Sequence, residues 1–247
     1  MTYLMSDLHG NRDAFRRMLQ EIALTPDDRL YVLGDAIDRG PDGIALLHDL
    51  RSMRNVVFLL GNHEHMMLDT FTEPDGTLAL TDRPETEIRQ WAGNGGYETM
   101  TGLAELTGEA QLELLAWLAT RPIAVQCTVG GRRFLLVHGR HPDPALRTNS
   151  PEQRIHCLWD RMEPEDPVPD RYDAVIFGHT PTCFYHHGNP FCRIWHGDRK
   201  IGIDCGLQTV SGAYGRLACL RLEDMQEFYV GKDGPSEMSA TEIAGPS

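Results

Sequence analysis

Three short polar strings constrain this chain more than any other feature, because each follows directly on an apolar run. The strings are DLHG at residues 7–10, GDAIDRG at 34–40 and GNHE at 61–64. Each places carboxylate, amide or imidazole groups at the end of an expected buried strand. Metal-assisted attack on phosphorus needs such donors to converge from several strand ends, with one carboxylate able to bridge two ions. The pattern therefore predicts a two-metal hydrolase.

Strands and helices are predicted to alternate along the first 60 residues. The apolar runs at 3–6, 30–33 and 55–60 have the length of buried strands, and the spacing of apolar residues favours helices at 11–22 and 41–53. Such alternation indicates βαβ units in an open sheet covered by helices. Ligands gather at the strand ends of such sheets, where the three strings lie.

The pattern changes after the third string. Residues 64–122 are predicted to form a helical insert, with helices at 65–71, 85–91, 96–103 and 108–120. Strand patterns then return and predict a second sheet, with a Gly130-Gly131 hairpin turn inside it. These strands are expected at 123–129, 134–137, 174–177, 193–195, 200–203, 216–222 and 225–230.

We interpret residues 1–230 as one catalytic domain, since 247 residues do not demand a second core. Residues 161–173, rich in proline and acidic side chains, are expected to form an exposed loop. Residues 231–247 contain few large apolar side chains and are expected to be a disordered tail.

Composition excludes several classes of protein. No apolar run is long enough to cross a bilayer, and a net charge of −13 argues against a nucleic-acid backbone as the main partner. The first motif follows Met1 so closely that no signal peptide fits, which predicts a cytoplasmic location. Six cysteines without a CxxC pair indicate reduced thiols. Nothing in the sequence marks an interface between subunits, so the oligomeric state is not predicted.

Two later histidines stand in matching positions. His138 ends the run FLLV, and His179 follows the run AVIFG. A single histidine is more often a packed or surface residue than a ligand. Repeated placement at the ends of apolar strands favours the metal-ligand interpretation for the set.

The strings DLHG, GDAIDRG, GNHE, VHG and GHTP, in this order, resemble those of the calcineurin-like metallophosphoesterases, and among them the phosphoprotein phosphatases of the bacterial and phage type. The resemblance covers about residues 3–222. It implies an α/β fold, a four-layer sandwich of two mixed β-sheets flanked by helices. It also implies two divalent metal ions, with Mn²⁺ as the first expectation and iron or zinc as alternatives.

The resemblance implies two ligand sets that share one carboxylate: Asp7, His9 and Asp35 for the first metal, and Asp35, Asn62, His138 and His179 for the second. A carboxylate has two oxygens to share between ions roughly 3.5–4 Å apart, which an imidazole lacks. A helix N-cap would explain Asp7 or Asp35 singly, but not the full set.

Further roles follow from the same resemblance. His63 would be the general acid that protonates the leaving oxygen, and Asp38 would hydrogen-bond its imidazole. Arg39 would bind phosphate oxygens through its planar guanidinium, and Arg161 resembles a second such arginine. The alternatives are that His63 is a third metal ligand and that Arg161 is a solvated loop residue.

Two features near these motifs have competing interpretations. Glu64 and Asp204 would either orient ligand histidines or serve as turn residues. The string WAGNGG at 91–96 also resembles an element of this family branch, but we expect a turn between helices with a core tryptophan at Trp91.

The reaction implied is hydrolysis of a phosphomonoester by a hydroxide that bridges the metals. A serine/threonine protein phosphatase acting on phosphoprotein substrates is the first expectation. The enzymatic alternative is a symmetrical dinucleoside tetraphosphate hydrolase, which resembles the chain in the same motifs. A metal-bound binding module without catalysis is a third hypothesis, and an intact His63, Asp38 and Arg39 argues against it.

Overall fold

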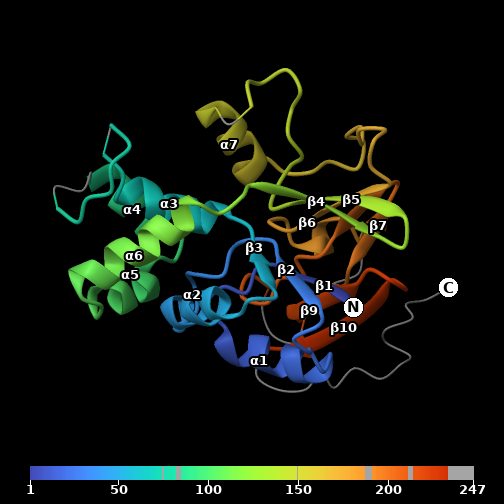
Figure 1. Cartoon of the computed structure of the whole chain (residues 1–247), viewed down its shortest axis with the longest axis horizontal. Coiled ribbons are helices and arrows are strands. Elements are labelled where there is room, and N and C mark those ends of the chain that lie inside the picture. The colour runs from blue at the N-terminus through green and yellow to red at the C-terminus, as the bar shows by residue number, and fades with distance from the viewer. Residues whose placement is uncertain (74, 82–84, 149, 187–190, 211–213, 233–247) are drawn as a thin grey trace.

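Two mixed sheets of five strands each, flanked by helices, form the core of the protein (Figure 1). This description comes from a computed structural model, and it covers residues 1–73, 75–81, 85–148, 150–186, 191–210 and 214–232. The predicted α/β sandwich is confirmed. Within the described residues, no helix has the length and apolar character that a membrane span requires.

The first sheet has the strand order β10-β9-β1-β2-β3. Its strands β1 (Thr2–Met5), β2 (Arg29–Val32) and β3 (Val56–Phe58) run parallel, as the βαβ pattern predicts. Strands β9 (Arg216–Arg221) and β10 (Gln226–Gly231) were expected in the second sheet. They instead add an antiparallel hairpin to the first sheet, because Tyr3 and Leu4 of β1 pair with Arg221 and Leu220 of β9. The parallel strands therefore end at one edge of the sheet.

The second sheet has the order β4-β5-β6-β8-β7. Strands β5 (Arg132–Val137), β6 (Ala174–Phe177) and β8 (Lys200–Gly202) are parallel, while β4 (Ala124–Val129) and β7 (Trp195–Gly197) pair antiparallel at the two edges. The predicted two-residue turn joins β4 to β5, and both of its glycines have positive φ.

Alternation along the strands creates separate cores. Leu4 of β1 packs between the sheets with Phe134 and Leu136 of β5. Its neighbours Tyr3 and Met5 point to the opposite face and pack beneath the helices. This period-2 pattern explains why residues 3–5 of β1 are all apolar and buried: both faces of this strand are covered.

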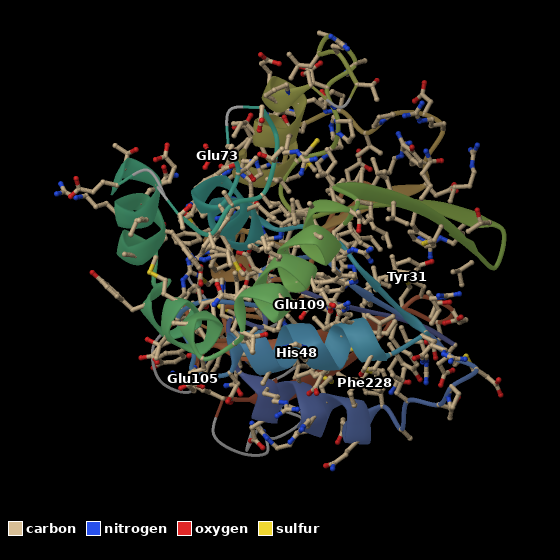
Figure 2. All side chains as sticks on the ribbon, turned by 60° about the vertical axis from the view of Figure 1, so that its left-hand side comes forward. Tyr31, His48, Glu73, Glu105, Glu109 and Phe228 are labelled. Atoms are coloured by element: carbon tan, nitrogen blue, oxygen red, sulfur yellow. The ribbon has the colours of Figure 1, made fainter. Side chains whose placement is uncertain are left out.

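Helices cover the outer face of the first sheet, and in Figure 2 they come toward the viewer. Figure 1 shows the four helices between β3 and β4 gathered on the left side of the molecule, away from the second sheet. The helices that precede β4 are α1 (Arg12–Glu21), α2 (Gly43–Ser52), α3 (Asn62–Thr70), α4 (Glu85–Gly93), α5 (Tyr97–Ala104) and α6 (Gly108–Ala119). The division into a catalytic domain and an insert stays a prediction.

Two helix predictions differ from the structure. Helix α3 begins at Asn62, earlier than predicted, because the Glu64 side chain accepts the Gly61 N–H at 3.0 Å and so caps the helix directly after the strand. Helix α7 (Pro151–Trp159) was not predicted. Its start carries a recognisable signal, since the Ser150 side chain caps it and proline occupies its first turn.

Three further predictions need comment. The predicted exposed loop at 161–173 is irregular but not wholly exposed, because Met162 and Tyr172 pack on the outer face of the second sheet. Strand β7 begins two residues later than predicted. The predicted tail falls almost entirely on residues 233–247, which lie outside the described residues.

All six cysteines are free, in agreement with the prediction of reduced thiols.

A pair of glycine variants tests how tightly the strand-end loops are packed. Gly10 (φ 66°) and Gly130 (φ 57°) have similar left-handed backbones. A Cβ at Gly10 would lie 2.3 Å from the Gly40 carbonyl oxygen, whereas nothing lies within 4 Å at Gly130. We expect Gly130→Ala to cost about 1 kcal/mol from backbone strain alone. Gly10→Ala should cost at least about 2 kcal/mol more, because a backbone atom must move. Equal midpoints in urea-induced unfolding would contradict this packing.

Candidate metal centre

Five of the predicted ligands lie at the carboxyl ends of parallel strands from both sheets. Asp7, Asp35 and Asn62 follow β1, β2 and β3 of the first sheet, while His138 and His179 follow β5 and β6 of the second. All are buried except His179, which is partly exposed. Because the two sheets present these ends to each other, residues far apart in sequence meet at one place.

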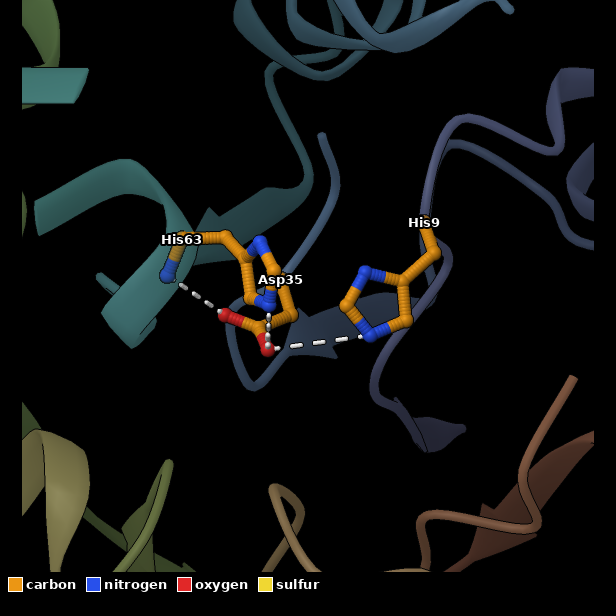
Figure 3. A group of neighbouring side chains, drawn as sticks. All are labelled: His9, Asp35 and His63. Atoms are coloured by element: carbon orange, nitrogen blue, oxygen red, sulfur yellow. Dashed lines mark hydrogen bonds and ion pairs between the residues drawn. The ribbon is translucent and has the colours of Figure 1, made fainter. Parts of the chain in front are cut away.

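Asp35 stands at the middle of this group and directs its two oxygens to different sides. Its Oδ2 lies 3.7 Å from Nε2 of His9 and 3.8 Å from Nε2 of His63 (Figure 3). Its Oδ1 lies 3.4 Å from Nε2 of His138. The carboxylate thus has the geometry needed to be shared between two ions, as predicted for the bridging ligand.

The remaining predicted ligands complete the two sides. Oδ1 of Asn62 lies 2.9 Å from both His138 Nε2 and His179 Nδ1. Oδ1 of Asp7 lies 3.9 Å from His9 Nε2, and its Oδ2 accepts the His179 backbone N–H at 3.0 Å. Asp7 therefore also joins the loops after β1 and β6.

Each ligand histidine has one ring nitrogen tied to a backbone carbonyl: His9 Nδ1 to Ile37 at 3.1 Å, His138 Nδ1 to Leu33 at 2.6 Å, and His179 Nε2 to Trp159 at 3.1 Å. A carbonyl oxygen only accepts, so the tied nitrogen carries the proton. In the neutral imidazole the other nitrogen presents its lone pair to the centre, the arrangement typical of metal-binding histidines.

The donor set fits divalent metal ions. Donors that bind one ion at ~2.0–2.2 Å stand about 3–4 Å from one another. Two groups meet a similar condition, with ligand atoms all within 4.8 Å: His9, Asp35 and His63, and Asp35, His138 and His179. Oxygen and imidazole donors of this kind suit manganese, iron or zinc.

Backbone strain is concentrated in this centre. Nine non-glycine residues within the described part of the chain have positive φ. Six of them are predicted site residues: Asp7, His9, Asp35, Asp38, Arg39 and His179. Non-glycine residues in this region cost of order 1 kcal/mol each, and such strain gathers at functional sites when the surroundings hold it.

Glu64 supplies much of that support. Its buried carboxylate accepts the backbone N–H groups of Asp35 at 2.9 Å, Ala36 at 2.8 Å, Ile37 at 3.3 Å and Gly61 at 3.0 Å. We expected Glu64 either to orient a ligand histidine or to be a turn residue; instead it organises the backbone of two ligand-bearing loops.

Asp204 has a local contact of a similar kind. Its Oδ1 accepts the Gly206 N–H at 2.8 Å, which agrees with the turn interpretation. Burial, together with repulsion from Asp7 and Asp35, raises the pKa of Asp204 well above its usual value.

Electrostatic coupling sets the charges of the metal-free centre. Burial opposes the charged form of His138, but Asp35 and its hydrogen bond raise the pKa of this imidazole to about 10. Burial also disfavours the charged form of Asp35 and so tends to raise its pKa. The charges of His138 and His63 outweigh this effect and hold the pKa of Asp35 well below the usual range. Without metal, a proton therefore resides on His138 at neutral pH.

The neighbouring groups respond differently. Burial and the charge of His138 lower the pKa of His179 to about 4. Burial and His63 lower the pKa of His9 well below its usual value. Both histidines are thus neutral and ready to bind a metal. Burial raises the pKa of Asp7 to about 6, although His138 opposes the shift.

His63 differs from the other histidines in its anchor. Its Nδ1 lies 2.6 Å from Oδ2 of Asp38, and both side chains are buried. A carboxylate stabilises an imidazolium, whereas a carbonyl mainly fixes a tautomer. The predicted contact between Asp38 and His63 is therefore present. Both proposed roles of His63, acid and third ligand, stay compatible with its position beside Asp35.

Trp91 is a site residue that the sequence interpretation missed. It is buried in α4, as expected of a core tryptophan, but its Nε1 also lies 3.0 Å and 2.9 Å from the two oxygens of Asp38. Nearby, the Gly95 carbonyl accepts the Arg39 N–H at 2.9 Å. The family-like WAGNGG string was the available signal, and the expectation of a simple turn understated it.

The two predicted phosphate-binding arginines, Arg39 and Arg161, are both exposed. Arg39 Nη1 lies 2.6 Å from His9 Nε2, the same nitrogen that a first metal would use. Metal binding would therefore displace this contact. Arg161 stands with its guanidinium 5.9 Å from the ring centroid of Phe184, and its charge contributes to the lowered pKa of His179.

Comparison with known proteins agrees with this geometry. The family described as calcineurin-like phosphoesterase matches residues 2–201. The serine/threonine-protein phosphatase 2 of Salmonella typhimurium is 27% identical over 184 residues, which cover 72% of this chain and 78% of that protein. The symmetrical bis(5'-nucleosyl)-tetraphosphatase of Glaesserella parasuis is 31% identical over 234 residues, covering 90% and 78%.

Solved structures with the same fold are more distant in sequence. A protein serine/threonine phosphatase from Saccharomyces cerevisiae aligns with a TM-score of 0.58 at 13% identity, covering 92% of this chain and 78% of its own. A metallophosphoesterase from Sphaerobacter thermophilus aligns with a TM-score of 0.52 at 19% identity, covering 92% and 85%. These similarities support the fold.

The charge state of His138 gives a testable prediction. A metal requires the neutral imidazole, so binding should release about one proton from His138 near pH 7.5. Because protons compete with the metal, affinity should fall as the pH is lowered. Calorimetric titration with Mn²⁺ in buffers of different ionisation enthalpy measures the protons released. His138→Gln should abolish this release, whereas substitution of the exposed His48 by glutamine should leave it unchanged. Binding without proton release would contradict the assignment.

Proposed function

The chain belongs to the calcineurin-like phosphoesterases, and we propose that it is a metal-dependent phosphomonoesterase acting on phosphoserine and phosphothreonine in proteins. The observation that carries this proposal is the buried pair of His63 and Asp38. A relative of this chain is a serine/threonine-protein phosphatase, which supports the same substrate class.

The leaving group explains why the pair matters. A serine or threonine alkoxide is strongly basic and leaves poorly unless its oxygen is protonated as the bond breaks. A nucleoside diphosphate is a stable anion near neutral pH and gains little from a proton donor. A histidine held by a carboxylate is therefore more useful for hydrolysing an alkyl phosphate than for splitting a polyphosphate chain.

The side chains divide the reaction as follows. Arg39 and Arg161 bind the equatorial phosphoryl oxygens and offset the charge that develops there. As hydroxide forms its bond to phosphorus, the bond to the ester oxygen breaks and that oxygen takes the proton from Nε2 of His63. Asp38 accepts a hydrogen bond from Nδ1 of His63 and stabilises the imidazolium before the transfer. No phosphorylated enzyme forms.

Metal ions supply the nucleophile in this proposal. Two divalent ions held by the centre would lower the pKa of a shared water and so provide hydroxide at neutral pH. Asp7, His9 and Asp35 would hold one ion, and Asp35, Asn62, His138 and His179 the other. Mn²⁺ is the first ion to test, with iron and zinc as alternatives.

Symmetrical hydrolysis of dinucleoside tetraphosphates is the second candidate function. The similarity to a symmetrical bis(5'-nucleosyl)-tetraphosphatase covers most of this chain and supports it. The two candidates share the metal centre and the motifs that contain Asp38 and His63, and they differ in how much the leaving group of each substrate needs an acid. Substrates with different leaving groups therefore separate them.

His63→Asn provides the test. With Mn²⁺ loaded, we expect turnover of a phosphothreonine peptide to fall at least ~100-fold because the proton donor is lost. Turnover of p-nitrophenyl phosphate should fall less than ~10-fold, since nitrophenolate leaves without protonation. Metal content, measured by elemental analysis, should stay unchanged. Asp35→Asn serves as the control that removes the bridging carboxylate and lowers turnover of every substrate.

Other outcomes would overturn specific parts of the proposal. Loss of metal in His63→Asn would identify His63 as a ligand. Preferential cleavage of a dinucleoside tetraphosphate by the unaltered protein would assign the chain to the second function. Absence of metal-dependent turnover of all three substrates would favour the non-catalytic binding module.

A further inference from the structure

We propose that Trp91 is a positioning residue for the general acid: its indole N–H fixes the Asp38 carboxylate so that Asp38 holds His63 in line with the leaving group. This inference rests on the acid role proposed for His63. It assigns a function in the chemistry to helix α4, which contributes no predicted ligand or phosphate-binding residue to the metal centre.

The contacts form a continuous line from the helical segment to the acid. Trp91 Nε1 lies 3.0 Å from Oδ1 and 2.9 Å from Oδ2 of Asp38. The same Oδ2 lies 2.6 Å from Nδ1 of His63. All three side chains are almost fully buried, so bulk water does not replace a missing donor.

Trp91 has a particular place among the partners of Asp38. In the described part of the chain, no other side chain makes a hydrogen bond to Oδ1. Without the indole, this buried oxygen lacks a donor, and the carboxylate is free to turn its charge away from His63. The indole therefore both shields the Asp38 carboxylate from water and fixes its orientation toward His63.

The surroundings hold both partners in place. Gly96 packs so closely that a Cβ would lie 2.6 Å from Cδ1 of Trp91, and Phe71 meets the indole edge-on at 6.3 Å between ring centroids. The Asp38 backbone has a left-handed φ of 69°, and its N–H donates to Oγ1 of Thr99 at 2.9 Å. Trp91 and Asp38 thus have little conformational freedom. An acid must be held in a fixed orientation relative to the leaving oxygen, and this restriction provides it.

The experiment removes the N–H while retaining the shape of the side chain. Site-specific replacement of Trp91 by β-(3-benzothienyl)alanine exchanges the N–H for sulfur, and Trp91→Phe provides a genetically simple variant. The matched control is Trp117→Phe in α6. That tryptophan lies in the same helical segment and stacks on Phe58 at 5.7 Å between ring centroids. Within the described residues it makes no hydrogen bond to Asp38 or His63.

Each Mn²⁺-loaded protein is assayed on a phosphothreonine peptide, phenyl phosphate and p-nitrophenyl phosphate. Loss of a hydrogen bond to a charged group should lower kcat at least ~10-fold on the peptide for both Trp91 variants. The loss should be smaller on phenyl phosphate and less than ~3-fold on p-nitrophenyl phosphate, because the need for a proton falls in that order. KM should stay within ~2-fold, since no phosphate contact is removed. The Trp117 control should keep the substrate ratios of the unaltered protein.

Combining the replacement with Asp38→Asn gives a second readout. If Trp91 acts through Asp38, the double variant should be no slower on the peptide than Asp38→Asn alone. Additive losses, or an equal fall on all three substrates, would overturn the inference and leave Trp91 a packing residue.

The two proposals fail in different ways. If the unaltered protein does not cleave the peptide but does cleave aryl phosphates, the protein-phosphatase proposal fails. The positioning of the acid is then judged from phenyl phosphate against p-nitrophenyl phosphate. If His63→Asn shows leaving-group selectivity and the Trp91 variants do not, the acid role stands and the inference on Trp91 is wrong.

Discussion

The arrangement of the metal centre depends most on the hydrogen bonds that the buried Glu64 carboxylate accepts from the backbone. Its two oxygens accept N–H groups from the loop after β2 and from the residue that precedes α3. Asp35 leaves its strand with a left-handed backbone, and Asn62 and His63 occupy the first turn of a helix. One carboxylate therefore fixes where the proposed bridging ligand, the proposed amide ligand and the proposed acid stand relative to one another.

The two-sheet architecture supplies the remaining ligands. Parallel strands from each sheet end at a common place, and each ligand histidine is then oriented by a backbone carbonyl rather than by a second side chain. Such carbonyls belong to the framework and cannot rotate independently. The backbone thus orients the proposed ligand histidines. His63 is instead oriented by the side chain of Asp38 and, in our inference, by that of Trp91.

Much of the fold and of the candidate site was predictable from local sequence patterns. Apolar runs ending in Asp, Asn or His indicated strands that deliver donors, and the order of the motifs indicated the family. The start of α3 was predicted too late, because a glutamate that caps the helix from N3 looks in sequence like a possible ligand partner. Helix α7 was not predicted, although an N-cap serine, Ser150, followed by a proline is a typical sequence signal for the start of a helix. The Trp91 contact joins residues 53 positions apart, which no local pattern reveals.

Local sequence patterns specify which chemical groups are present and at which strand ends they stand, because strand length and hydrophobic alternation are local properties of the chain. Long-range packing, in contrast, specifies which oxygen of Asp35 faces which histidine, which nitrogen of each imidazole remains available, and which donor holds Asp38. Those choices depend on long-range packing of two sheets and a helical segment. Burial then strengthens each of these contacts by excluding the water that would otherwise compete for them.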